Sequence, residues 1–229
     1  MRSKSIVNNG AGSPRSRHYA DYSDEEMQQV RCLEQRKAAV VGEFGSQVLL
    51  KHPSSTVKDP VNDAVRADIK AMVSAAGPDE LVIHNLADKH DTHVALSARI
   101  IEAIRDLPKE DRPKKLYGGE VWRDLDWLLA EDKVMWDVSD RENILNALVG
   151  VFDSQISGGK RYDLASAARR RAHATYQESH HVDVVEGASV AMDLTPLIED
   201  DSLDVAEYTA AYIERLGDDV RERITRFRA

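Results

Sequence analysis

The 229-residue sequence contains a single cysteine, Cys32, so no disulfide can form within one chain. This fits a reducing compartment. No apolar run approaches the roughly 20 residues that a membrane span needs, and the basic N-terminal segment has no apolar core of the kind found in secretory signals. The net charge of -9 argues against a general nucleic-acid binder, which needs a positive field. These absences predict a cytoplasmic protein with neither nucleic acid nor a membrane as its partner.

Strand-like and helix-like segments alternate along the chain. Segments with β-branched or apolar centres predict strands at 4–7, 47–50, 80–86, 114–122, 133–138 and 188–194. Apolar residues at helical spacing predict helices at 22–44, 61–77, 91–107, 141–156, 163–176 and 205–227. Ser23 with Glu26, and Ser139 with Glu142, have the spacing of a capping box. This alternation predicts one doubly wound α/β domain, with a parallel sheet covered by helices on both faces.

The order of these segments has one irregularity at its start. The chain begins almost directly with a strand and has no strand–helix unit before it, whereas the first strand of a doubly wound fold is usually central. We therefore expect that the fold lacks its first strand and that the domain, residues 1–229, is incomplete at its N-terminus.

Polar residues cluster where the strand predicted at 80–86 meets the following helix. Open parallel sheets bind ligands beyond the carboxyl ends of their strands. His93 shares a helical face with Leu96, Ile100 and Ile104, so we expect it to be partly buried at the mouth of a cleft. Taken alone, the residues favour a plainer alternative, in which Asp88 or Asp91 caps the helix and the histidines bond nearby carbonyls. The cluster comprises His84, Asn85, Asp88, His90, Asp91 and His93.

A charged pair interrupts the apolar face of the helix predicted at 22–44. Arg31 and Glu34 share this face with Met27 and Val30. Either the two charges pair at the edge of the core, or Arg31 contacts a ligand, and the sequence weighs both equally.

Other candidates favour structural roles. Trp122, Trp127 and Trp136 are expected in the core rather than in a carbohydrate platform. His180, His181 and Asp183 indicate a polar segment before the last strand, from which one side chain could reach the cleft.

Several ordered segments resemble the PIG-L/LmbE family of zinc-dependent N-deacetylases. HNLADKHDTHVA (84–95) is similar to the family's second zinc motif, in which a His-x-x-His segment follows a sheet strand. NNGAGSPR (8–15) resembles its second strand and Gly-rich turn, and VRCLEQRKAAVVGEF (30–44) resembles its Arg-x-x-Glu helix. KLYGGEVWRDLDW, FDSQISGGKRYDLA and AMDLTPLI resemble later segments of a bacterial branch. The resemblance covers most of the chain and implies a Rossmann-like, three-layer sandwich with a mostly parallel sheet.

The resemblance also implies roles for individual residues. His93 matches the histidine that binds Zn²⁺, and His90 matches the histidine that stabilises the oxyanion formed when water attacks the amide. Asp91 matches the acid that orients that histidine. Arg31 matches the arginine that contacts the sugar substrate, and Asp59 matches a substrate-contacting acid.

One family motif has no counterpart. In the family, a His-Pro-Asp-Asp segment supplies two further zinc ligands and the general base. The only His-Pro here is His52-Pro53, which Ser54 and Ser55 follow. We therefore expect an incomplete Zn²⁺ site.

Two function classes follow from these observations. The first is metal-dependent hydrolysis of the N-acetyl group of an N-acetylglucosamine-type sugar, with an incomplete site in this chain. The second is a non-catalytic family member that binds the sugar or regulates. The expected partners are a small N-acetylated amino sugar and a second copy of the chain in a homo-oligomer.

Overall fold

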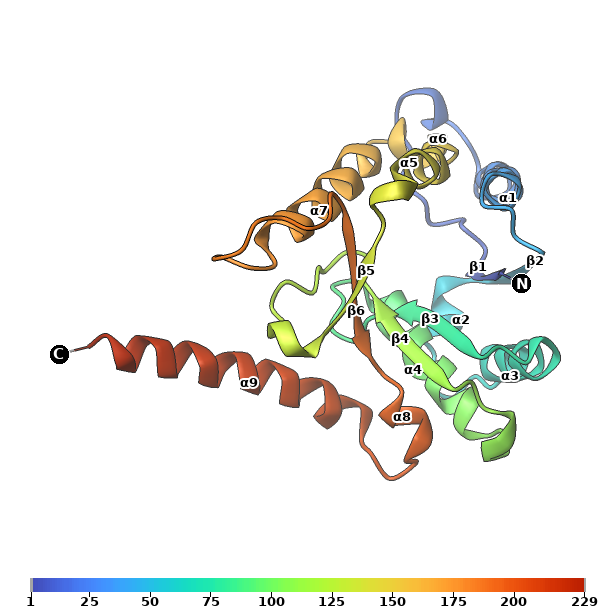
Figure 1. Ribbon diagram of the computed structural model, residues 1–229. Coiled ribbons are helices and arrows are strands. Elements are labelled where there is room, and N and C mark those ends of the chain that lie inside the picture. The colour runs from blue at the N-terminus through green and yellow to red at the C-terminus, as the bar shows by residue number, and fades with distance from the viewer. Residues whose placement is uncertain (1, 229) are drawn as a thin grey trace. The chain divides into compact units, whose positions relative to one another are not determined.

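The computed structural model describes residues 2–228 as an α/β protein (Figure 1). The chain forms two compact units, each with its own sheet and helices. The first unit takes in the chain up to Asp59 and then Asp137–Ala188, and the second takes in Pro60–Trp136 and the chain from Ser189 onward. The α/β fold class is confirmed, and the single domain stays a prediction.

The first unit contains a two-stranded parallel sheet. β1 (Ser3–Asn8) pairs with β2 (Ser46–His52) in a register that runs from Ser3 opposite Ser46 to Ile6 opposite Leu49. Between them in the chain lies α1 (Asp24–Val41), as expected for a strand–helix–strand unit. Ser23 and Glu26 form the predicted capping box, in which each side chain bonds the backbone N–H of the other.

The remaining helices of the first unit come from two parts of the chain. A single turn, Arg17–Tyr19 (η1), precedes α1, and α2 (Ser54–Lys58) follows β2. The second part provides η4 (Ser139–Arg141), α5 (Glu142–Gly150), α6 (Asp153–Ile156) and α7 (Tyr162–Tyr176). Both α5 and α6 contact α1 and α7, so these helices pack as one group.

The second unit contains a four-stranded mixed sheet in the order β3-β4-β6-β5. Its strands are β3 (Glu80–His84), β4 (Lys115–Gly119), β5 (Lys133–Asp137) and β6 (Ala188–Asp193). β3 pairs with β4 in parallel, whereas β4 pairs with β6 antiparallel. The alternating pattern predicts an interior strand at residues 81–85. β3 instead stands at the end of this sheet, so that prediction is wrong.

Helices α3 (Ala64–Ala76) and α4 (Asp91–Arg105) precede and follow β3 and pack on each other. α3 ends at Gly77, whose left-handed backbone (φ +49°) suits glycine. Ser97, Ile101 and Ile104 form the buried face of α4, and the Ser97 hydroxyl donates to the carbonyl of His84 at 2.8 Å. The packed face is thus rotated from the predicted face, with which it shares Ile104.

The C-terminal part of the second unit is helical. Short turns η2 (Lys109–Asp111) and η3 (Ala130–Asp132) precede strands β4 and β5. α8 (Pro196–Glu199) follows β6, and α9 (Val205–Arg226) is the long helix drawn in red in Figure 1. Within residues 2–228, no helix has both the length and the apolar composition that a membrane span requires.

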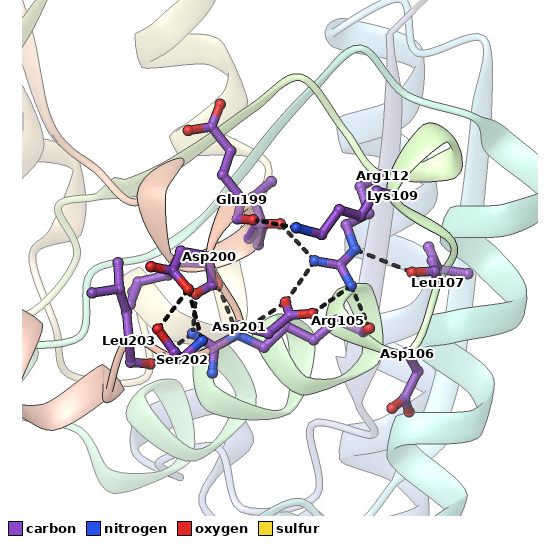
Figure 2. A network of polar contacts seen from close by, with 12 residues as sticks. Arg105, Asp106, Leu107, Lys109, Arg112, Glu199, Asp200, Asp201, Ser202 and Leu203 are labelled. Atoms are coloured by element: carbon purple, nitrogen blue, oxygen red, sulfur yellow. Dashed lines mark hydrogen bonds and ion pairs between the residues drawn. The ribbon is translucent and has the colours of Figure 1, made fainter.

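An arginine joins the end of α4 to the end of α8 (Figure 2). Arg112 uses all five of its N–H donors: they bond the carbonyls of Arg105, Leu107 and Ile198 and both carboxylate oxygens of Asp201, at 2.6–3.1 Å. The last carbonyls of a helix have no partner within it. Arg112 therefore satisfies acceptors of both helix ends at once.

The second predicted capping box is wrong. Ser139 lies in η4 rather than before α5, and α5 begins at Glu142 without a side-chain cap. The Ser139 hydroxyl instead donates to Asp137 and accepts from the backbone N–H of Glu186. The helix predicted at 141–156 also divides into α5 and α6.

Candidate functional site

The predicted polar cluster lies in the loop from β3 to α4, beyond the carboxyl end of β3. Asn85 begins the loop and is fully buried, and its backbone and side-chain N–H groups donate to the carbonyl of Gly119 at 2.9 and 3.1 Å. Gly118 permits this approach, because a Cβ there would lie 3.0 Å from the Asn85 Cα and 2.9 Å from a Leu194 methyl. The loop is therefore held against the end of β4.

Asp88 is the central acceptor of this loop. Its side chain is fully buried. One carboxylate oxygen accepts from the backbone N–H groups of Lys89 and Arg123, at 2.6 and 3.0 Å. The other oxygen accepts from His93 Nδ1 at 2.9 Å and from the backbone N–H of Trp122 at 3.4 Å. Burial alone would raise the pKa of Asp88, but these hydrogen bonds outweigh it and hold the pKa below its ordinary value. Asp88 is therefore an ionised carboxylate inside the protein.

This carboxylate decides the tautomer of His93. An ionised carboxylate can only accept hydrogen bonds, so Nδ1 of His93 must carry the proton. Burial lowers the pKa of His93, and the bond to Asp88 offsets only part of this effect. The ring is thus neutral at pH 7, and its Nε2 keeps a lone pair. A histidine held in this way by a carboxylate is typical of metal ligands and of bases.

Three histidine rings stack in this loop. His93 lies between His84 and His90, with ring centroids 4.0 and 4.5 Å apart and ring planes 9° and 22° apart. The ring of Trp122 lies beyond His90, at 6.4 Å. Burial, followed by the neighbouring His93, lowers the pKa of His84 to about 4. The stack therefore runs from a half-buried, neutral His84 to an exposed His90.

The remaining predicted residues of this cluster lie at its rim. His90 and Asp91 are both exposed at the start of α4. The His90 carbonyl accepts from the backbone N–H groups of His93 and Val94. Within residues 2–228, the carboxylate that bonds a ring of the histidine stack is Asp88 rather than Asp91. The catalytic roles of His90 and Asp91 stay predictions.

These side chains do not assemble a zinc site. A metal lies in the plane of the imidazole that binds it, about 2.0–2.1 Å from the nitrogen. Nearly parallel rings stacked 4.0–4.5 Å apart cannot share one ion in that way. Across residues 2–228 no group of three His, Cys, Asp or Glu side chains is arranged to hold a metal. His93 therefore supplies one suitable donor, without the further ligands that a zinc site needs.

Arg31 and Asp59 belong to the first unit. Arg31 pairs with the buried Glu34 at 2.5 Å and lies over the ring of Phe152. Glu34 also accepts from the backbone N–H and the hydroxyl of Ser154, at 2.6 and 2.8 Å. The structural alternative for Arg31, an ion pair at the core, is therefore present. Asp59 follows the last residue of α2, and the substrate roles of Arg31 and Asp59 stay predictions.

The tryptophans and the polar segment around His180 were also predicted from the sequence. Trp122 is exposed and Trp127 and Trp136 are half-buried, so the prediction of three core tryptophans is wrong. His180, His181 and Asp183 are exposed, as expected for a polar segment. The sequence pointed to Asp88 only as a helix cap. The hydrogen bond between Asp88 and His93 is not predicted from the sequence. The signal for it is their spacing of five residues, with Asp88 before the start of α4 and His93 in its first turn.

Solved structures with a similar fold are known. The conserved protein TT1542 from Thermus thermophilus matches with a TM-score of 0.60 and 15% identity, over 89% of this chain and 85% of that one. The N,N'-diacetylchitobiose deacetylase from Pyrococcus horikoshii matches with a TM-score of 0.62 and 14% identity, over 89% and 76%. The 4-carboxy-2-hydroxymuconate hydratase GalB from Pseudomonas putida matches with a TM-score of 0.58 and 13% identity, over 85% and 96%.

The sequence itself has no such counterpart, since no protein-family model and no curated protein matches it. At 13–15% identity, the structural matches establish the fold alone. The hydratase shows that this fold also supports other chemistry. The chain has a mixed α/β fold, which it shares with the conserved protein TT1542 and with the N,N'-diacetylchitobiose deacetylase.

Proposed function

We propose that this protein binds an N-acetylated amino sugar, of the N-acetylglucosamine type, at the loop between β3 and α4. The observation that carries the proposal is the buried Asp88, which fixes the neutral His93 beyond the carboxyl end of β3. This is the edge at which α/β sheets bind ligands. A deacetylase of an N-acetylated sugar, the chitobiose enzyme, shares the fold.

The polar groups of the loop suit an acetamide. The lone pair on His93 Nε2 can accept a hydrogen bond from the N–H of the acetamide, or it can bind a cation. His90 is exposed beside it, and an imidazole N–H can donate to the acetamide oxygen. In a hydrolase the same donor would stabilise the negative charge that develops on this oxygen.

We further propose that the 229-residue chain hydrolyses such sugars poorly or not at all. The support is the donor set: His93 is one zinc donor, while the stacking of its neighbours and the lack of a three-ligand group in residues 2–228 leave no complete site. A catalytic zinc usually needs three protein ligands and a water. This favours sugar binding without turnover over a complete metal-dependent deacetylase.

The deacetylase remains the competing function, and one experiment separates the two. The purified chain is titrated with Zn²⁺ and with N-acetylglucosamine by calorimetry, and acetate release is measured with and without Zn²⁺. We expect weak zinc binding, measurable sugar binding, and acetate release near the background. Sugar binding should fall in His90→Ala and His93→Ala but not in the control His181→Ala, a histidine that is exposed outside the loop.

Two results would decide against the binding role. If the chain binds one zinc tightly and releases acetate at a rate that His93→Ala abolishes, then it has a complete site and is a deacetylase. If it binds no sugar, then the ligand class is wrong. A fusion that places a strand and a His-Pro-Asp-Asp motif before the chain tests the family relation separately, because we expect it to gain both zinc affinity and turnover.

A further inference from the structure

Helix α9 has a face of exposed apolar residues that the fold does not cover. Its N-terminal half is anchored in the second unit: Thr209 is buried, the Tyr208 hydroxyl donates to the Asp193 carbonyl, and Arg215 pairs with Asp132. From Asp218 onward, the ion pairs of α9 within the described residues form inside the helix itself. The second half of α9 thus lacks the contacts that hold its first half.

The exposed apolar residues from the middle of α9 to its C-cap, Phe227, have the spacing of a coiled coil. Ile213, Val220, Ile224 and Phe227 are 51%, 44%, 56% and 82% exposed. With Gly217 they are separated by four, three, four and three residues, which is the alternation of the two core positions in a heptad. A stripe with this spacing faces a partner helix, because each member returns to the same side after about 3.5 residues.

Gly217 gives a second indication of a partner. It lies inside the helix, has no left-handed backbone, and a Cβ added to it would meet only the Arg221 guanidinium, at 3.7 Å. Alanine would fit here and would favour the helix by about 1 kcal/mol. The described fold therefore does not require this glycine, whereas a second helix approaching closely would.

The charges beside the stripe specify the partner. Residues 214–219 contain three acids and one arginine, a net charge of -2, and residues 221–228 contain four arginines and one glutamate, a net charge of +3. Two copies of α9 running in opposite directions bring Glu214, at the start of the acidic stretch, toward Arg221, at the start of the basic stretch of the other copy. A parallel pair would instead place Arg223 beside Arg228 of the other copy, at the two positions that flank a parallel core.

The antiparallel arrangement also matches side-chain sizes. With a two-fold axis between Gly217 and Val220, Ile213 of one copy faces Ile224 of the other, and Gly217 faces Val220. The next layer places Ala210 opposite Phe227. In two of these three layers a small residue opposes a larger one, and Glu214 lies near Arg221 of the second copy. We propose that α9 is the interface of a homodimer in which two copies of the helix pair antiparallel through residues 213–227.

The dimer is tested on the full chain by sedimentation velocity from about 1 to 200 µM, a range suited to a small interface. We expect a concentration-dependent shift from monomer to dimer in the wild type. Val220→Glu should weaken the dimer at least about tenfold. Val40→Glu is the matched control, because it makes the same change at an exposed helical valine in α1, and it should leave the dimer unchanged.

The direction of pairing is tested by reversing charges. Glu214→Arg and Arg221→Glu should each weaken their own dimer, because like charges then meet. Mixing the two variants should restore a heterodimer, since each reversed charge then faces its opposite. A wild type that stays monomeric at all concentrations, equal effects of Val220→Glu and Val40→Glu, or no heterodimer in the mixture would each overturn the proposal. Circular dichroism confirms that each variant keeps its helix content.

Discussion

At the scale of single residues, the arrangement of the candidate site depends on Asp88. Asparagine at this position keeps the shape but replaces one acceptor oxygen by an NH₂ group, which then faces N–H donors. We expect Asp88→Asn to lower the free energy of unfolding by about 3 kcal/mol, because charged and buried hydrogen bonds are lost together. The measurement is urea unfolding at pH 7.

Asp91→Asn is the control for this prediction. Asp91 is exposed in the first turn of α4, where its charge favours the positive end of the helix dipole. Its loss should cost no more than about 1 kcal/mol. If the two substitutions are equally mild, then the buried carboxylate does not hold the loop as described.

A second residue-scale prediction concerns acid stability. Ser157 and Tyr19 donate to Asp153 at 2.6 Å each, and these bonds lower the pKa of Asp153. A lowered pKa in the folded state means stability that is present above the ordinary value of 3.8 and is lost as pH falls through the folded value. We expect Asp153→Asn to lower the thermal midpoint at pH 6, with a difference from wild type that shrinks below about pH 4. A difference that stays constant from about pH 6 to about pH 2.5 would contradict this.

The sequence predicted some of these residues and not their partners. His93 is half-buried as predicted, although the packed face of α4 is rotated from the face that the periodicity indicated. The partners of Asp88 were not predictable, since Trp122 and Arg123 come from a loop 34 and 35 residues away. Trp122 is expected in the core because large aromatic residues are usually buried, yet it lies at the exposed end of the histidine stack.

At the scale of elements, Arg112 is the residue whose loss should be felt most at the ends of α4 and α8. Lysine keeps the charge but has three donors in place of five, so at least two of the five acceptors lose their bond. The Arg112 side chain is only 7% exposed, so water cannot replace these bonds fully. We expect Arg112→Lys to lower the free energy of unfolding by about 2 kcal/mol, measured by urea unfolding.

The matched control is Arg66→Lys. Arg66 also makes a bidentate ion pair, with the carboxylate of Asp106, but both side chains are about one-third exposed. An exposed pair contributes less than about 1 kcal/mol. Equal losses in the two variants would show that satisfying the helix ends adds nothing to the ion pair.

Elements were the most predictable level of this structure. Every predicted strand is present, and so is every predicted helix except that at 141–156, which divides into α5 and α6. Repeating apolar patterns and turn residues are properties of each segment on its own. The Ser23 capping box was also local and correct. The capping box predicted at Ser139 does not form, because the Ser139 hydroxyl accepts from the backbone N–H of Glu186, which lies 47 residues further along the chain.

At the scale of the whole molecule, the alternation of strands and helices predicted the α/β class but not the direction of every strand. β6 pairs antiparallel with β4, and an alternating apolar pattern is the same for either direction. The fold does not settle the chemistry either, since a hydratase shares it with a deacetylase. Function therefore has to be read from the loop after β3 rather than from the architecture.

The last prediction concerns cooperativity. The chain crosses between the two units three times, after Asp59, Trp136 and Ala188, and two crossings fall at ends of β5 and β6. Unfolding the first unit would release the ends of these strands, so we expect one transition for the whole chain, as for a single domain. All three tryptophans, Trp122, Trp127 and Trp136, belong to the second unit, so their fluorescence reports on that unit alone.

The test uses one buried side chain of the first unit. Met27 in α1 is fully buried, and Met27→Ala should cost about 2–5 kcal/mol. If the chain unfolds in one cooperative transition, Met27→Ala should lower the urea midpoint measured by tryptophan fluorescence as much as the midpoint measured by far-ultraviolet circular dichroism. Ile101→Ala, an equally buried position in α4, provides the reference shift from within the second unit. If Met27→Ala leaves the fluorescence midpoint unchanged while Ile101→Ala lowers it, then the units unfold independently and the chain is two domains.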